Sequence, residues 1–96
     1  MSETIQTAVA ALNAKLGEST LDGSAKFVID GEGAVIIDEN GARAGDEDTD
    51  VTLTADAETF QAIMDGDLDP TSAFMSGKLA VDGDMGMAMK LGSVLS

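Results

Sequence analysis

With 96 residues, the chain has room for one domain and a modest hydrophobic core. Its 44% hydrophobic content is typical of a globular protein, while its formal net charge of −13 disfavours binding to nucleic acids and to anionic membrane surfaces, which attract clustered lysine and arginine. The absence of cysteine and histidine from the sequence excludes disulfides, zinc–thiolate sites and the common nucleophile–base pairs.

An amphipathic helix is predicted at the start of the chain. Apolar residues recur at helical spacing from Ile5 to Leu16, Ser2 can cap the N-terminus, and Gly17 supplies the stop. The stretch 21–23 then predicts a turn into an extended segment.

Strand patterns follow in close succession. Alternating or β-branched apolar residues predict strands at residues 25–30, 34–38, 42–44 (a weak one) and 51–54. Asn40-Gly41 predicts a hairpin, because both residues tolerate positive φ. An acidic loop, residues 46–50, precedes the strand at 51–54.

The second half of the chain begins with helices. Asp56 is placed to cap one helix, and Asp69-Pro70 is placed to begin another, with the acid as N-cap and proline at the first helical position. The predicted elements are helices at 56–65 and 70–76, a fifth strand at 78–82 and a last helix at 85–95. This order predicts an α+β fold, with a five-stranded, mainly antiparallel sheet and helices gathered on one face.

The acidic residues do not form a recognisable catalytic or metal site. Loops starting at Asp46 and Asp65 have the alternating carboxylates of a calcium loop, but both lack its glycine at position six and its glutamate at position twelve. Carboxylates clustered in turns are usually solvated. We therefore expect no enzyme activity, no catalytic residue, no metal and no cofactor.

Methionines are concentrated in the last third of the chain. In the final predicted helix, Met85, Ala88 and Met89 share a face, whereas Met87 points elsewhere. These side chains can simply pack in the core. The other interpretation is that they line a cavity that accepts varied apolar ligands, because methionine is flexible and polarisable.

The C-terminal half resembles the sterol carrier protein-2 (SCP-2) family. Residues 68–91, LDPTSAFMSGKLAVDGDMGMAMKL, match the family's Pro-x-Ser-Ala-Phe segment, which runs through Gly-Lys-Leu to a Gly-x-Met-Gly-x-Ala-x-Lys-Leu helix. Residues 50–54 and 56–64 are similar to that family too. The similarity extends in pattern over residues 1–96, which are therefore expected to form a single lipid-binding domain.

The resemblance implies a five-stranded sheet covered by helices, with an apolar tunnel between them. Family members bind fatty acids, fatty acyl-CoA, phospholipids or sterols without a metal or cofactor. Carried over by position, the expected ligand-binding residues are Phe60, Ile63, Met64, Phe74, Met75, Met85, Met89, Leu91 and Leu95. From the sheet, Val35 and Ile37, or alternatively Ile36, are expected to contribute.

Two roles are consistent with this resemblance. The first is a non-enzymatic carrier of a fatty acid, fatty acyl-CoA, phospholipid or sterol-like ligand. Animal members of the family are typically basic, whereas this chain is acidic, and its negative charge weighs against attraction of the coenzyme A phosphates. The alternative is an accessory or dimerisation module that serves an acyl-metabolising enzyme without a free ligand, because folds of this family occur fused to enzymes.

The expected location is the cytoplasm. Residues 1–4 lack the basic and apolar regions of a signal peptide, and no apolar stretch approaches the roughly 20 residues that span a bilayer. We therefore expect no stable insertion into a membrane.

Overall fold

The computed structural model describes residues 3–17 and 23–95, with the main chain alone for residues 94 and 95. The predicted cap Ser2 and the first two residues of the predicted turn at 21–23 lie outside the described residues. In chain order the elements are α1 (Glu3–Leu16), β1 (Ala25–Ile29), β2 (Gly33–Asp38), β3 (Gly41–Ala44), β4 (Val51–Ala55), α2 (Ala57–Met64), α3 (Pro70–Met75), β5 (Ala80–Gly83) and α4 (Met85–Leu95).

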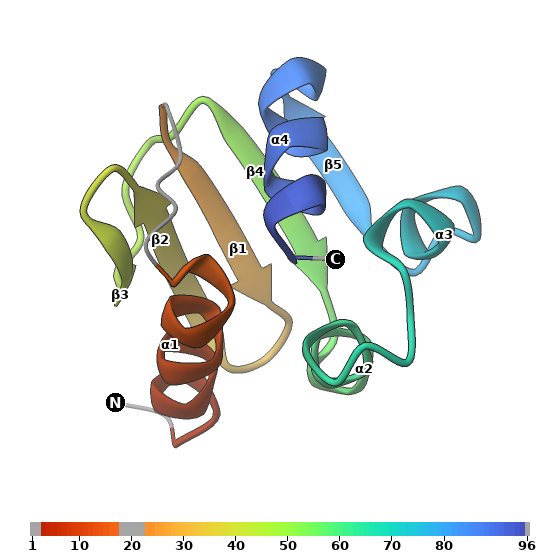
Figure 1. Cartoon of the computed structure of the whole chain (residues 1–96), viewed down its shortest axis with the longest axis horizontal. Helices are drawn as coiled ribbons and strands as arrows, with labels where there is room; N and C mark the ends of the chain where they lie inside the picture. The colour runs from red at the N-terminus through yellow and green to blue at the C-terminus, as the bar shows by residue number, and fades with distance from the viewer. Residues whose placement is uncertain (1–2, 18–22, 96) are drawn as a thin grey trace.

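The five strands form one sheet in the order β3-β2-β1-β4-β5 (Figure 1). All neighbouring strands are antiparallel except β1 and β4, which lie parallel at the centre. The predicted α+β class and the mainly antiparallel five-stranded sheet are therefore confirmed. The central parallel pair was not predicted, because alternating hydrophobicity identifies a strand without identifying its neighbours.

The helices cover one face of the sheet. α1 lies over β2 and β3, α4 lies over β1, β4 and β5, and α2 contacts α1 while α3 contacts α4 (Figure 1). Buried side chains of β1, Ala25, Phe27 and Ile29, alternate with less buried ones, as a strand with one face on the core requires. The ring of Phe27 meets that of Phe60 on α2 edge-to-face at 4.8 Å between centroids, which ties α2 to the sheet.

The β2–β3 hairpin forms at the predicted place, but with a different turn. Asp38 pairs with Gly41, so that Glu39 and Asn40 make the loop. In this hairpin turn Gly41 has a positive φ, of 102°, and among the described residues every positive φ belongs to a glycine. The expectation of a positive φ at Asn40 was therefore wrong. Its N–H instead donates to the Asp38 carboxylate at 2.9 Å, which holds the loop in a conformation that Asn40 can adopt without strain.

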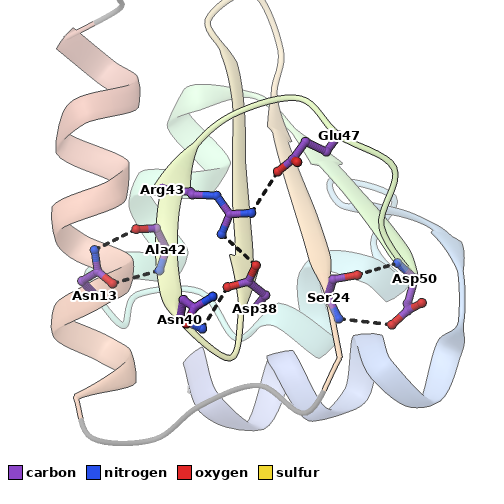
Figure 2. A network of polar contacts seen from close by, with 8 residues as sticks. All are labelled: Asn13, Ser24, Asp38, Asn40, Ala42, Arg43, Glu47 and Asp50. Atoms are coloured by element: carbon purple, nitrogen blue, oxygen red, sulfur yellow. Dashed lines mark hydrogen bonds and ion pairs between the residues drawn. The ribbon is translucent and has the colours of Figure 1, made fainter.

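The crossover segment, residues 45–50, joins β3 to β4 along the sheet face opposite the helices. Lys26 reaches it through an ion pair with Asp46 at 2.8 Å. Arg43 bridges Asp38 at 2.7 Å and Glu47 at 2.9 Å (Figure 2). The hydrogen bond from Arg43 is the main cause that lowers the pKa of Asp38 below its ordinary value. Part of the acidic loop is thus paired with cations.

Candidate functional site

A row of side chains across three strands forms the floor of an apolar cavity. Phe27 of β1 pairs with Leu53 of β4, and Leu53 pairs with Val81 of β5, so that the three residues stand side by side. All three line the cavity from below. The same row continues to Val35 of β2, which is fully buried in the core.

The walls come from three helices. α2 contributes Ile63, while α3 and α4 face each other across the opening. A carboxylate caps the start of each of these two helices. Asp69 accepts a hydrogen bond from the Thr71 N–H at 3.0 Å, and Asp84 accepts one from the Gly86 N–H at 2.9 Å. We call this space the α3–α4 cavity. Its volume is about 480 Å³, and its lining consists of Phe27, Leu53, Ile63, Asp69, Pro70, Thr71, Phe74, Met75, Leu79, Val81, Met85, Ala88, Met89, Gly92 and Ser93.

The mouth of the α3–α4 cavity exposes large apolar side chains. Phe74 is 42% exposed, Met75 81%, Met85 47% and Met89 73%. Single exposed apolar residues are common on proteins, whereas a group of them around one opening marks a binding site. We call these four residues the apolar rim.

Five of the residues expected from the resemblance lie together in this lining: Ile63, Phe74, Met75, Met85 and Met89. Their role in binding stays a prediction. Together they show that the final helix and the short helix after Asp69 do face a common space.

The other residues expected at the site lie elsewhere. Phe60 and Met64 line a separate groove of about 400 Å³ between α1 and α2. Leu91 is fully buried in the core and is not part of the cavity lining. The side chain of Leu95 lies outside the described residues. An apolar face on a helix can be read from the sequence, but the neighbour that covers it cannot.

The strand residues expected at the site also lie outside it. Val35 and Ile37 belong to the core on the helix side of the sheet, while Ile36 is outside that cluster and approaches Gly45 of the crossover segment. The sheet instead contributes Phe27, Leu53 and Val81. Apolar residues that alternate along these strands predict buried positions. The pairing of β1 with β4 and of β4 with β5 then places the three side chains side by side under the cavity.

Met87 is the buried methionine of α4. It is 9% exposed and its terminal methyl group occupies the space beside Gly23, where a side chain would collide with it. It belongs to the core cluster, in agreement with the prediction that it points away from the face shared by Met85, Ala88 and Met89.

Few polar groups reach the α3–α4 cavity. Its lining contains one carboxylate, on Asp69, and the hydroxyl-bearing residues Thr71 and Ser93. In the part of the chain that the structure describes, no group of three or more acidic residues is arranged to hold a metal ion. The geometry is that of a shallow apolar chamber, which can exclude water from a hydrocarbon.

None of the helices described here is long and apolar enough to cross a membrane.

Comparison with known proteins gives a family match over nearly the whole sequence. The model of the SCP-2 sterol transfer family matches residues 2–96. Hydroxysteroid dehydrogenase-like protein 2 of Danio rerio is 49% identical over 47 residues, which are 49% of this chain and 11% of the relative. Sterol carrier protein 2 of Homo sapiens is 48% identical over 46 residues, 48% of this chain and 8% of that protein. The matched segment thus spans about a tenth of the length of these relatives.

Solved structures share the fold over a larger part of the chain. The crystal structure of sterol carrier protein 2 like 2 from Aedes aegypti has a TM-score of 0.76 at 25% identity and covers 95% of each chain. The solution structure of the palmitated protein SCP2L2 from the same organism has a TM-score of 0.70 at 28% identity, covering 99% of this chain and 95% of that one.

Proposed function

Because the chain belongs to the SCP-2 sterol transfer family, we propose that it is a non-enzymatic lipid carrier that holds the hydrocarbon part of its ligand in the α3–α4 cavity. The ligand classes are a fatty acid, a fatty acyl-CoA, a phospholipid or a sterol-like molecule. The observation that carries the proposal is a cavity of about 480 Å³ that has a mostly apolar lining and opens at the apolar rim. This volume lies within the roughly 300–1,000 Å³ of small-molecule sites.

The free energy of burial is sufficient for this function. Each methylene removed from water contributes about 0.8 kcal/mol, so that ten buried methylenes contribute about 8 kcal/mol. Ordering of the flexible tail and of the rim side chains offsets part of this gain. We therefore expect dissociation constants in the micromolar range, where binding and release are both rapid enough for transfer.

The expected contacts are those of the walls and the floor. Ile63, Phe74 and the rim methionines would close on the tail from the sides, while the sheet supports it from below. The palmitated state of the related Aedes aegypti protein supports an acyl tail as one suitable occupant. We place the carrier in the cytoplasm, in keeping with its acidity and its lack of cysteine.

Native mass spectrometry tests the proposal directly. The protein is stripped of lipid, incubated with a twelve-carbon alcohol, a twelve-carbon fatty acid, a phosphatidylcholine and a sterol in turn, and sprayed under conditions that keep complexes intact. We expect a one-to-one adduct with at least one of these lipids, at micromolar concentration. Absence of every adduct from folded protein would contradict the carrier function.

A second role is favoured by the size of the curated relatives. The segment matched in hydroxysteroid dehydrogenase-like protein 2 is 11% of that protein, so a domain of this kind can be one part of a longer chain. The present domain could accordingly serve an acyl-metabolising enzyme as an accessory or dimerisation module. Protein that stays lipid-free in the experiment above, yet forms dimers or binds such an enzyme in analytical ultracentrifugation, would favour this role.

A further inference from the structure

The lining of the α3–α4 cavity contains no positively charged side chain, although Lys78 and Lys90 neighbour its residues Leu79 and Met89 in the sequence. The sequence has five cationic side chains, on Lys15, Lys26, Arg43, Lys78 and Lys90, and all five lie in the described part of the chain. None of them is in the cavity lining. Lys26 and Arg43 are engaged in the ion pairs of the crossover segment, on the opposite face of the sheet.

The helix N-termini beside the cavity are already neutralised. A helix start attracts anions through its unpaired N–H groups. At α3, Pro70 has no N–H, and the Thr71 N–H donates to the Asp69 carboxylate at 3.0 Å. At α4, the Asp84 carboxylate accepts from the Gly86 N–H at 2.9 Å and from the Met87 N–H at 3.3 Å. The chain's own carboxylates therefore occupy the positions that an anionic ligand would seek.

The charged group that remains in the lining is negative. Asp69 contributes a carboxylate at the edge of an apolar chamber, in a chain whose formal net charge is −13. A ligand carboxylate or phosphate beside it would meet a like charge. By contrast, the hydroxyl-bearing side chains of Thr71 and Ser93 can both donate to and accept from an uncharged polar group.

We infer that the α3–α4 cavity selects lipids whose polar end carries no net negative charge, such as an alcohol, an ester or a sterol hydroxyl, over free fatty acids and acyl-CoA. The inference rests on the proposed carrier function and specifies its ligand. The hydrocarbon tail supplies the affinity, and Asp69 supplies the discrimination between head groups.

Calorimetric titration with a matched pair of ligands tests this inference. Dodecanoate and 1-dodecanol present the same tail with a charged and an uncharged end. In Asp69→Asn, the amide can still cap α3, but the charge is gone. We expect this variant to lower the ratio of the dodecanoate to the dodecanol dissociation constant by about fivefold, the factor for one unit charge near contact in a water-like medium.

The control variant is Asp67→Asn, which removes the same charge from an exposed position outside the cavity lining. It should leave the ratio of the two dissociation constants nearly unchanged. A second variant, Thr71→Lys, places a cation in the lining and removes a hydroxyl that could serve an uncharged head group, so it should lower the ratio of the dodecanoate to the dodecanol dissociation constant.

The outcomes separate the two proposals. If neither ligand binds the folded protein, the carrier function itself fails. If both bind and the two aspartate variants change the ratio equally, the carrier stands and the head-group inference is overturned. Stronger binding of lauroyl-CoA than of dodecanol to the unmodified protein would overturn it as well.

Discussion

Among single residues, two positions in the second half of the chain are fixed by contacts with the main chain. Gly83 ends β5 beside the start of β4 with a φ of 114°, and a Cβ there would lie 2.6 Å from the Asp50 carbonyl oxygen and 3.0 Å from the Val51 Cα. Asp56 begins α2, with its carboxylate accepting from the Thr59 N–H at 2.7 Å. Each position can be tested by one substitution.

Gly83→Ala should destabilise the protein by about 2–4 kcal/mol. The new methyl group has to adopt an unfavourable φ and also displaces the main chain of β4. Gly31→Ala is the matched control, because Gly31 has a φ of 79° but no atom within 4 Å of the added Cβ; it should cost only about 1–2 kcal/mol. Urea unfolding measures both values, and equal losses would show that crowding at β4 is unimportant.

The cap of α2 should make the free energy of unfolding depend on pH. The hydrogen bond from the Thr59 N–H, followed by that from the Thr59 side chain, lowers the pKa of Asp56 below its ordinary value of 3.8. Since the folded state favours the carboxylate, this stabilisation is present above that ordinary value and is lost as the pH falls through the lowered pKa.

The variant Asp56→Asn tests this dependence, with Asp67→Asn as the reference that removes an equal charge from an exposed turn. At pH 7 we expect the Asp56 variant to be the less stable of the two, and we expect the difference to shrink as the pH is lowered from 7 to below 3.8 and through the lowered pKa. Urea unfolding over this pH range gives the free energies. A difference that stays constant on acidification would contradict the role of the Asp56 carboxylate.

At the scale of elements, the sequence predicted the helices and strands well, because each carries its own start and stop signals. Asp56 and Asp69 cap helices as expected, and β1 shows the expected alternation. The sequence could not specify which element lies against which. Phe60 and Met64 form the predicted apolar face of α2, yet Phe60 contacts Phe27 and both residues line the groove beside α1.

The final helix illustrates the same limit. A helix with methionines on several sides can turn any of them inward, and the choice depends on space provided by distant residues. Met87 is buried because Gly23 leaves room for it, and Met89 is then 73% exposed at the cavity mouth. The five expected residues that line the cavity come from the segments that resemble the family, 56–64 and 68–91, whereas the floor residues Phe27 and Leu53 meet through the parallel pairing of β1 with β4.

A charge on α4 at the rim should weaken lipid binding without unfolding the protein. Met89→Glu removes an apolar contact worth up to about 1.5 kcal/mol, so we expect the dissociation constant of 1-dodecanol to rise about tenfold. An uncharged ligand is chosen so that the effect does not depend on repulsion of its head group. Calorimetry measures the affinity, and circular dichroism checks the fold.

Ala10→Glu is the control for this variant, because it adds the same charge at an exposed position of α1, away from the cavity lining. It should bind 1-dodecanol as the unmodified protein does. Unchanged affinity in folded Met89→Glu would remove α4 from the binding site.

At the scale of the whole molecule, charge repulsion is the dominant electrostatic feature. The sequence has 18 acidic and 5 basic side chains, and the ion pairs found among the described residues use only Lys26 and Arg43. Folding concentrates the remaining negative charge on a small surface, which opposes the compact state. Dissolved salt should relieve this repulsion, since the screening length falls from about 10 Å at 0.1 M to about 3 Å at 1 M.

We therefore expect the melting temperature to rise with sodium chloride. For a domain of this size, each kcal/mol gained raises it by about 4–8 °C, and a rise of at least about 4 °C between 0.01 and 0.5 M salt is expected. Differential scanning calorimetry measures the shift. A melting temperature that falls with salt would show that the ion pairs of the crossover segment outweigh the general repulsion.

The apolar rim also has a consequence for redox chemistry. Oxidation converts a methionine thioether into a polar sulfoxide. Met75 and Met89, 81% and 73% exposed, are accessible to dissolved peroxide, while Met87, 9% exposed, is shielded by the core. Oxidative stress would therefore make the entrance to the cavity hydrophilic first, while the fold beneath it stays intact, and sulfoxide reduction would restore the entrance.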